Sequence, residues 1–397
     1  MPEQRIVLRN CGIIDPRDVA TWRARGGLEA LRKARDVLGP DKVIEQIKAS
    51  GLRGRGGAGF PAGLKWELVR KAPGDEKYVI CNADEGEPGT YKDRYILERD
   101  PFTLIEGIAI ACFALGAGRA YVYLRDEYHD LRHHLDRAIA QVEGEMPLGC
   151  QIIVHEGAGA YVCGEESALM ESLEGKRGEP RFRPPFPPSK GLWGKPTAIH
   201  NIETLMNVSQ IVLNGAEWFS GIGTAQSKGT KVLSVSGDVR RPGVVEVPLG
   251  TPLREVVEEM AQAEDVKLVQ VGGASGRVIP DDRLDTPLAF ESCLGAGAII
   301  VFNSQRDVVE IARETIAFFV DESCGKCTPC RQGARAMLEI LNRLAAGRGI
   351  KGDLVRLQEL AEHMALSSLC GLGQAAPNFV ADSLQCFGHE YETRVAA

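Results

Sequence analysis

The chain has 397 residues, 44% of them hydrophobic, and its formal net charge at pH 7 is −7. This length exceeds one ordinary hydrophobic core, so two to four globular domains are expected. The negative charge argues against nucleic acid as the main partner, and no apolar run approaches the roughly 18 residues of a membrane span. The N-terminus lacks the charged-then-apolar order of a secretory signal, and the 11 cysteines, clustered only near one end, are typical of thiols in a reducing compartment. We therefore expect a cytoplasmic location.

The first predicted elements are a helix and a glycine-rich loop. Residues 28–49 carry apolar side chains at helical spacing, and GLRGRGGAGFPAGLKW at 51–66 follows directly. This loop is not the dinucleotide-binding fingerprint, because a helix rather than a strand precedes it. Five glycines in nine positions, with arginines and Lys65 nearby, are typical of a cradle for anionic groups. The alternative is a mobile surface loop, although Phe60 and Trp66 would anchor it.

An acidic turn follows the first predicted strand. The strand covers residues 78–82, and the turn ADEGEPG covers 83–89. Open α/β sheets bind ligands at the carboxyl ends of their strands. Asp84, Glu85 and Glu87 place three carboxylates in four positions, and such groups repel one another unless they meet hydroxyls, amides or cations. Sugar hydroxyls would satisfy them, and a solvated acidic turn is the alternative.

Helices and strands then continue to alternate. The predicted elements are a helix capped by Asp100 and Pro101 and ending near Ala117, a strand at 120–123, an amphipathic helix at 126–143, a strand at 152–154 and a helix from about Glu165. Gly159 and Gly164 bracket the turn before that last helix. The pair Glu165 and Glu166 either complements a helix dipole or contributes to a ligand site, where a carboxylate could repel a 2′-phosphate.

The second half of the chain changes character twice. Residues 183–196 are rich in proline, so we expect neither a helix nor a central strand there but a segment crossing the surface near the site. The motif His200-Asn201-x-x-Thr204 is either a helix cap or a polar part of the site. From Lys231 short strands with turns, and a helix near 252–263, predict a mixed β domain of about 80 residues. From about Asp307 onward the pattern is helical.

Three closely spaced cysteines are the most informative chemical feature. Cys324-x-x-Cys327-x-x-Cys330, with one remote ligand, suits a [4Fe-4S] cluster, whereas a zinc ribbon would show two separated Cys-x-x-Cys pairs. Cys370 lies between glycines that permit a close approach of the backbone, and Cys386 is its rival as the fourth ligand. The alternative is that these residues are unmetallated core cysteines.

Five motifs together carry a resemblance to a known family. GLRGRGGAGFPAGLKW, CNADEGEPGTYKDR, YVCGEE, PPFPPSKGLWGKPT and ESCGKCTPCR occur in this order between about residues 30 and 385. They resemble the NADH-binding flavoprotein subunit of respiratory complex I and the diaphorase subunits of NAD-linked hydrogenases and formate dehydrogenases. The resemblance implies an α/β fold with a Rossmann-like FMN- and NAD(H)-binding domain at 1–225, a β-grasp-like, soluble-ligand-binding type domain at 226–305 and a helical [4Fe-4S] domain at 306–397.

The resemblance also implies a set of cofactor-binding residues. The FMN cradle would use Arg55, Gly56, Gly57, Lys65, Asn82, Asp84, Glu85, Gly164, Glu165, Asn201 and Thr204. The NAD(H) site would use Gly57, Phe60 and Glu87, with Phe186 near the adenine and Glu166 selecting NAD over NADP. The cluster ligands would be Cys324, Cys327, Cys330 and Cys370. His200 departs from the pattern of this family, in which asparagine is expected at that position.

The implied function is that of an NADH dehydrogenase (diaphorase) subunit in a multi-subunit redox complex. Hydride would pass between NAD(H) and FMN, and single electrons between FMN and the cluster, so no side chain need act as acid or base. An electron-bifurcating or NAD-reducing hydrogenase or formate dehydrogenase is the alternative to complex I, and a structural zinc scaffold is a remote one. Expected partners are a small thioredoxin-like iron-sulfur subunit and a larger iron-sulfur or catalytic subunit, which could attach the chain peripherally to the cytoplasmic side of a membrane.

Overall fold

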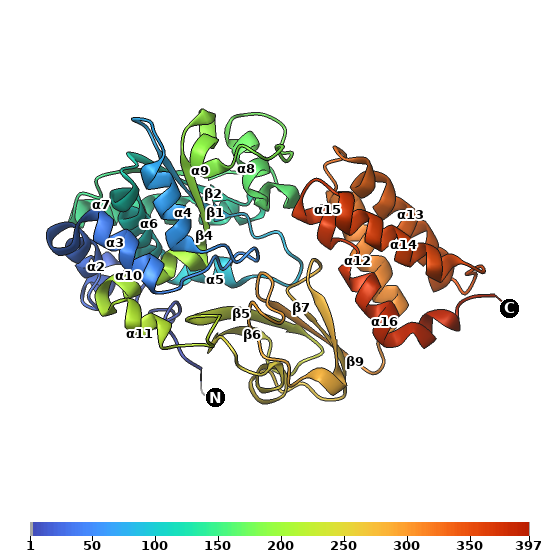
Figure 1. The fold of residues 1–397 in the computed structure, drawn as a ribbon. Helices are drawn as coiled ribbons and strands as arrows, with labels where there is room; N and C mark the ends of the chain where they lie inside the picture. Colours follow the sequence, from blue (N-terminus) through green and yellow to red (C-terminus); the bar gives the residue numbers. More distant parts are fainter. Residues whose placement is uncertain (1–2, 397) are drawn as a thin grey trace.

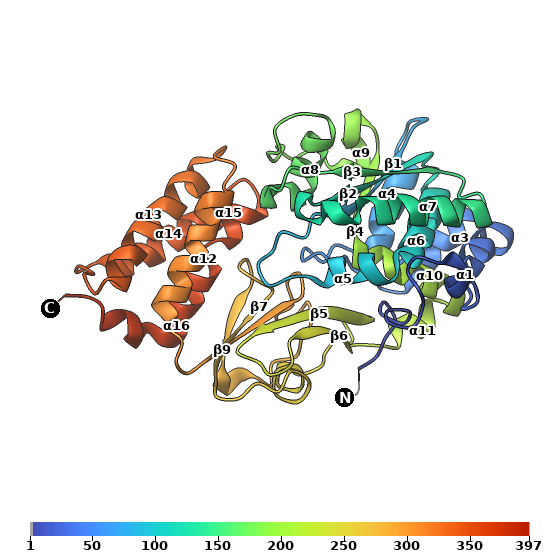
Figure 2. The same ribbon diagram turned by 180° about the vertical axis from the view of Figure 1, so that it is seen from behind.

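The computed structural model describes residues 3–396 and arranges them as an α/β region, a second β-sheet and a helical bundle (Figure 1). The α/β region and the bundle lie at opposite ends of the molecule, and the second sheet lies between them along one side, as the view from behind also shows (Figure 2). None of the helices within these residues combines the length and the apolar character needed to cross a membrane.

The α/β region contains most of the elements of the chain. Its strands are β1 (Tyr78–Ala83), β2 (Arg119–Leu124), β3 (Gln151–Glu156) and β4 (Thr197–Asn201). Its α-helices are α1 (Val19–Arg23), α2 (Glu29–Arg32), α3 (Gly39–Ala49), α4 (Ala62–Lys71), α5 (Lys92–Arg99), α6 (Pro101–Leu115), α7 (Arg132–Glu145), α8 (Glu166–Leu173), α9 (Pro187–Lys190), α10 (Ile202–Asn214) and α11 (Ala216–Ser220). A π-helical segment (Lys33–Leu38) and 3₁₀ segments (Asp126–Leu131, Tyr161–Gly164 and Leu192–Gly194) complete it.

The first sheet is entirely parallel, with strand order β3-β2-β1-β4. The inner strand β1 is buried on both faces, because Val79 and Cys81 pack into one apolar cluster while Tyr78 and Ile80 pack into another. Continuous apolar strands of this kind are expected where helices cover both faces. Since parallel strands end at the same edge, β1 and β4 bring the acidic turn and the start of α10 together there.

Helix α6 shows how local sequence and packing agree. The Asp100 side chain caps its N-terminus, Pro101 occupies the first turn, and Gly116 ends it in a left-handed conformation. At Gly107 an added Cβ would lie 2.3 Å from the carbonyl oxygen of Leu205. Only glycine therefore allows α6 to pack this closely against α10.

The second sheet has the mixed pattern of a β-grasp-like domain. It contains β5 (Thr230–Gly237), β6 (Gly243–Pro248), β7 (Val266–Val271), β8 (Arg277–Pro280) and β9 (Ala298–Asn303), with a π-helical segment (Glu255–Met260) and a 3₁₀ turn (Asp281–Arg283). The strand order is β6-β5-β9-β7-β8, and β5 and β9 are parallel whereas the other neighbours are antiparallel.

A buried carboxylate fastens the N-terminal segment to this sheet. Glu246 on β6 accepts hydrogen bonds from the backbone N–H groups of Ile6, Val7 and Leu8 at 2.9, 3.0 and 2.8 Å, and from the Thr230 hydroxyl. Burial raises the pKa of Glu246 to about 7, although these hydrogen bonds oppose the shift. One side chain thus joins segments 240 residues apart.

The C-terminal bundle contains α12 (Val308–Glu322), α13 (Thr328–Ala345), α14 (Asp353–Ser367), α15 (Gly371–Ala375) and α16 (Asn378–Glu392). The Asp307 side chain caps α12, as expected from the start of the helical pattern. Cys327 occupies the N-cap position of α13, and Cys370 occupies that of α15. Two of the proposed cluster ligands therefore lie where helices begin.

Several local expectations were wrong. The helix at 28–49 is interrupted by the π-helical segment and restarts at Gly39, next to Pro40. The proline-rich stretch 183–196 does contain a helix, the four-residue α9, because proline is tolerated in a first turn where no intrahelical N–H bond is needed. The helix expected near 252–263 is present but shorter, because helical backbone covers residues 253–260 and six of them form a π-helical segment.

Candidate functional site

Four segments meet at the carboxyl edge of the parallel sheet. An added Cβ at Gly56 would lie 3.1 Å from Cβ of Asn201, so the glycine-rich loop rests on the start of α10. The Asn82 amide donates to the carbonyl oxygen of Gly164 at 2.9 Å, and an added Cβ at Gly164 would lie 3.6 Å from Oδ2 of Asp84. The glycine-rich loop, the acidic turn, the YVCGEE segment and α10 thus converge at this edge of the sheet.

Two polar groups at this edge have capacity for a further hydrogen-bond partner. Oδ2 of Asp84 is buried and has no hydrogen-bond partner, and burial raises the pKa of Asp84 to about 7, with Arg125 opposing the shift. Nζ of Lys65 donates to the carbonyl oxygen of Ile199 at 3.0 Å and lies 3.4 Å from Oε2 of Glu166. A hydroxyl-bearing, anionic ligand such as FMN fits this donor and acceptor set.

Three predicted cradle residues direct their side chains elsewhere. The Arg55 guanidinium is buried against the second sheet, where it donates to the carbonyl oxygens of Thr230 and Lys228. The Glu85 carboxylate accepts from the first backbone N–H groups of α5 and from a tyrosine hydroxyl, so a solvated acidic turn is excluded there. The Glu165 carboxylate caps α8. It therefore serves the start of this helix, which is one of the two roles that the sequence left open.

Glu87 joins the acidic turn to the second sheet. Its carboxylate accepts from the backbone N–H and the hydroxyl of Ser275, both at 2.8 Å, and from the Tyr161 hydroxyl at 2.7 Å. Burial raises the pKa of Glu87, although these hydrogen bonds oppose the shift. The side chain is therefore placed at the boundary between the two sheets.

Two of the predicted nucleotide residues, Phe60 and Phe186, are exposed. Phe60 lies two residues before α4, Phe186 is the N-cap residue of α9, and the two residues are 44% and 54% exposed. Glu166 pairs with Lys65 and, at 3.0 Å, with Arg183. Two exposed rings beside paired charges suit the stacking of a planar base and the binding of a polar nucleotide.

His200 is neutral in this environment. Burial lowers its pKa well below the usual value, and the neighbouring Lys65 lowers it further. Trp66 Nε1 donates to Nε2 of His200 at 2.8 Å, so the imidazole proton resides on Nδ1. The departure from asparagine therefore places a neutral, oriented ring next to the cradle.

The cysteines of the bundle gather around two helix starts. An added Cβ at Gly373 would lie 2.8 Å from Cβ of Cys330, and the Ser323 hydroxyl lies 3.3 Å from Sγ of Cys330. Burial raises the pKa of Cys330 to about 11, and the charges of the nearby Cys327, Cys370 and Cys324 make smaller contributions in the same direction. The charged neighbours of Cys386 are instead Arg283 and two aspartates.

This donor set fits a four-iron cluster. Burial raises the pKa of Cys370, while the backbone N–H groups of Gly373 and Leu372 point at its sulfur and oppose the shift, as they would support a thiolate ligand. Within residues 3–396, no three His, Cys, Asp or Glu side chains converge on the position of a single ion. A cubane cluster presents its four ligand sites at separate corners and does not need such convergence.

Direct contacts link the cysteine loop to the cradle. Glu322, the last residue of α12, accepts from the backbone N–H of Tyr161 at 3.0 Å. Arg177 donates to the carbonyl oxygen of Cys324 at 2.7 Å, and Lys326 donates to that of Pro180 at 2.8 Å. Both candidate cofactor sites therefore belong to one connected framework.

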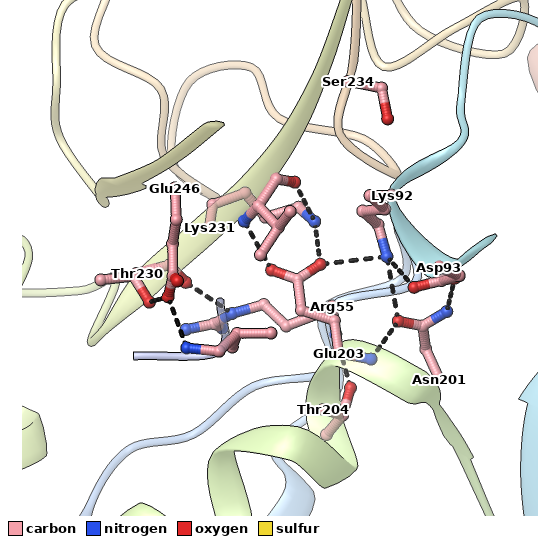
Figure 3. A network of polar contacts seen from close by, with 12 residues as sticks. Arg55, Lys92, Asp93, Asn201, Glu203, Thr204, Thr230, Lys231, Ser234 and Glu246 are labelled. Atoms are coloured by element: carbon pink, nitrogen blue, oxygen red, sulfur yellow. Dashed lines mark hydrogen bonds and ion pairs between the residues drawn. The ribbon is translucent and has the colours of Figure 1, made fainter. Parts of the chain in front are cut away.

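Buried charges beneath the cradle were missed by sequence reasoning. Lys92, Asp93, Glu203 and Lys231 have side chains that are at most 4% exposed and pair with one another (Figure 3). Two of them occur in the motif CNADEGEPGTYKDR, but nothing in their local pattern separates a buried charge from an exposed one.

Comparison with known families agrees with this architecture. Residues 47–210 match the Nuo51 FMN-binding domain, residues 232–279 match the SLBB domain, and residues 310–394 match the NADH-ubiquinone oxidoreductase-F iron-sulfur binding region. The three matches fall on the α/β region, the second sheet and the bundle, respectively.

Similar proteins occur in two kinds of complex. An NADH-quinone oxidoreductase subunit of Rhizobium meliloti is 45% identical over 98% of this chain and 97% of its own length. The NADP-reducing hydrogenase subunit HndC of Solidesulfovibrio fructosivorans is 44% identical over 98% of this chain and 83% of its own length. A chain of an NAD⁺-reducing [NiFe]-hydrogenase in the air-oxidized state superposes with a TM-score of 0.90 at 43% identity, covering 96% of this chain and 67% of that one. The chain thus belongs to the family of FMN-binding, [4Fe-4S]-containing oxidoreductase subunits that is found in NADH-quinone oxidoreductases and in NAD- or NADP-reducing hydrogenases.

Proposed function

We propose that the chain passes hydride between NAD(H) and FMN and single electrons between FMN and one [4Fe-4S] cluster, as the diaphorase subunit of a multi-subunit redox complex. The observation that carries this proposal is the framework joining the two sites, in which Tyr161 and Arg177 of the cradle side bind Glu322 and Cys324 of the cluster side. FMN supplies the conversion between paired and single electrons. The chain supplies binding, orientation and electrostatics.

The residues of the cradle divide into side-chain and backbone contributors. Lys65 would neutralise an anionic group, the Asp84 carboxylate would accept from a hydroxyl, and the Asn82 and Asn201 amides would orient the ligand. Gly56, Gly57 and Gly164 would admit it closely because they lack Cβ atoms. Arg55, Glu85, Glu165 and Thr204 contribute by shaping the backbone, because their side chains already bind protein groups.

The NAD(H) site is proposed to lie over the exposed face of the cradle. Phe60 and Phe186 would stack on planar rings, with Phe186 near the adenine. Glu87 and Gly57 would border the nicotinamide end, and Glu166 would disfavour a 2′-phosphate by charge repulsion. Cys324, Cys327, Cys330 and Cys370 would hold the cluster.

An anaerobic titration tests this function. The full chain, reconstituted with FMN and iron-sulfur cluster, is titrated separately with NADH and NADPH while flavin and cluster absorbance are followed. We expect NADH to bleach both chromophores and NADPH to do so less effectively. A chain that binds FMN but is not reduced by NADH would contradict the proposal.

The assembly around the chain is a separate part of the proposal. Its hydrogenase-type relatives and the 43% identical hydrogenase structure support a NAD-reducing hydrogenase as a second candidate beside complex I. In either assembly we propose a small thioredoxin-like iron-sulfur subunit and a larger iron-sulfur or catalytic subunit as partners, and a cytoplasmic location with any membrane attachment made by those partners. Co-purification of the native complex and identification of its subunits distinguish the assemblies.

A further inference from the structure

The first turn of α10 is held by a compact group of buried charges. Glu203 accepts at Oε2 from Nζ of Lys92 at 3.0 Å and from Nζ of Lys231, and at Oε1 from the backbone N–H of Val232 at 2.8 Å (Figure 3). Both lysines are at most 1% exposed, and Glu203 is fully buried. One carboxylate therefore faces α5 on one side and β5 of the second sheet on the other.

The group has a fixed charge state. Burial opposes the ionisation of Glu203, but the charges of Lys231, Lys92 and a nearby arginine outweigh it and keep its pKa below the usual range. Burial likewise opposes the charge of Lys92, but Asp93 and Glu203 outweigh it and raise its pKa. Burial lowers the pKa of Lys231 to about 8. Near pH 7 the two lysines are thus cations that face the anionic Glu203.

Lys92 and Asp93 also fix the orientation of the Asn201 amide. Oδ1 of Asn201 accepts from Nζ of Lys92 at 3.2 Å and from the backbone N–H of Glu203 at 3.0 Å. Nδ2 of Asn201 donates one hydrogen to Oδ2 of Asp93 at 2.7 Å, and Oδ1 of Asp93 binds Lys92 at 2.7 Å. Because Oδ1 faces two donors and Nδ2 faces an acceptor, only one orientation of the amide satisfies all of its partners. This orientation also fixes the direction in which the second N–H bond of Nδ2 points.

The residues next to Asn201 connect this hydrogen-bond network to the glycine-rich loop. Thr204, in the same helical turn, accepts at its hydroxyl from the backbone N–H of Arg55 at 2.9 Å. An added Cβ at Gly56 would lie 3.1 Å from Cβ of Asn201. A displacement of the first turn of α10 would therefore move both the Asn201 amide and the backbone of the loop that lines the cradle.

We propose that Lys92 and Asp93 are positioning residues of the FMN site, which act by orienting the Asn201 amide, and that Glu203 holds Lys92 in place for this task. Lys231 has the same burial and the same partner carboxylate, but within residues 3–396 its Nζ donates to Glu203 and to the backbone of β5 and not to Asn201, so it fastens the second sheet rather than the cradle. This inference rests on the proposed function, because it concerns the FMN site.

A matched pair of substitutions tests the proposal. Lys92→Met and Lys231→Met each remove one buried cation from Glu203 and change the net charge equally. FMN is titrated into the flavin-free full chain with its cluster reconstituted, the dissociation constant is measured by flavin fluorescence, and the Tm of each variant is recorded. We expect both variants to lose similar thermal stability, but only Lys92→Met to weaken FMN binding, by about tenfold, as expected for the loss of one charge-assisted hydrogen bond.

Further measurements separate positioning from general stability. Asp93→Asn keeps an oxygen for Asn201 but removes the charge that faces Lys92, so we expect an intermediate loss of FMN affinity; it replaces Lys92→Met in the comparison if that variant does not fold. At saturating FMN the KM for NADH should stay that of the wild type in all three variants. Equal weakening of FMN binding by Lys92→Met and Lys231→Met, or none by Lys92→Met and Asp93→Asn, would overturn the inference. A wild-type chain that does not bind FMN would instead refute the proposed function.

Discussion

The α/β region and the helical bundle prepare their sites in opposite ways. Around the cradle, charged side chains are already paired within the protein, as Glu203 is with two lysines. In the bundle, burial raises the pKa values of Cys330 and Cys370, so the uncharged thiol is favoured there. Because a metal ligand must be a thiolate, binding of iron has to displace those protons. We therefore expect the cradle to be organised by the protein alone and the cysteine loop to depend on its cluster.

Removing a cluster ligand should have the largest effect, and it tests the difference between the two regions most directly. Cys330→Ser should abolish cluster absorbance and bound iron and should reduce hydrogen-exchange protection at residues 323–330 and at the start of α15, because the loop loses the group that crosslinks it. FMN binding should persist, since the buried charges beneath the cradle are unchanged. Absorbance, iron content and exchange mass spectrometry measure these outcomes.

The matched control for this prediction is Cys386→Ser. Cys386 lies among Arg283 and two aspartates, so its replacement should leave the iron content at the wild-type level. Loss of FMN together with the cluster in Cys330→Ser would show that the two regions do not differ in the way described. Loss of iron in Cys386→Ser would reverse the choice between the two candidate ligands.

A smaller effect is expected at the nucleotide face. Glu166→Ala removes a carboxylate that pairs with Lys65 and Arg183, leaving two cations free to meet a 2′-phosphate. We expect kcat/KM for NADPH relative to that for NADH to rise by about tenfold. Glu171→Ala, on the same helix and paired with Arg181, is the control and should not change this ratio. Equal changes with both nucleotides would exclude a selective role for Glu166.

The smallest expected effect concerns the pH dependence of stability. Burial raises the pKa of Glu246 from 4.5 to about 7, so the native state holds this proton more tightly than the unfolded chain. The contribution of the group to stability is therefore fully present below about pH 4.5 and is lost as the pH rises toward 7. Glutamine carries no titratable proton. The difference between the Tm of Glu246→Gln and the Tm of the wild type should therefore shift in favour of the variant as the pH rises from 5 to 8.

Thermal unfolding across this pH range measures that difference. The exposed Glu264 provides the control, because Glu264→Gln should differ from the wild type by an amount that varies much less with pH. A constant gap between Glu246→Gln and the wild type would mean that the buried carboxyl does not titrate in this range. For a chain of 397 residues, each kcal/mol of altered stability is expected to shift Tm by about 1 °C.

Local signals in the sequence predicted much of the fold. Asp100 caps the helix that it was expected to start, α12 begins next to Asp307, where the helical pattern was expected to begin, and the strand at 78–82 appears as β1. The family, both bound cofactors and NAD(H) binding followed from five long motifs, and comparison with known proteins confirmed them. The domain boundaries after residues 225 and 305 stay predictions, as do the roles of individual cofactor-binding residues.

Contacts between distant residues explain what could not be predicted. Lys92 meets Glu203 only because β1 and β4 are neighbours in the sheet, and no local pattern marks a lysine as buried. Arg55 was expected in the cradle from its position in a glycine-rich motif, yet the second sheet supplies the carbonyl groups that draw its side chain away. The sequence identified the segments of the site but not which way each side chain would turn.

The hydrogen bonds of Glu246 have a consequence for the order of events during synthesis. Residues 6–8 leave the ribosome long before their acceptor on β6, which follows about 240 positions later. At about 5–20 residues per second, the N-terminal segment must wait roughly 12–48 s for that carboxylate. During this interval its backbone N–H groups depend on water, so the final seating of the N-terminus is a late step that follows the emergence of the second sheet.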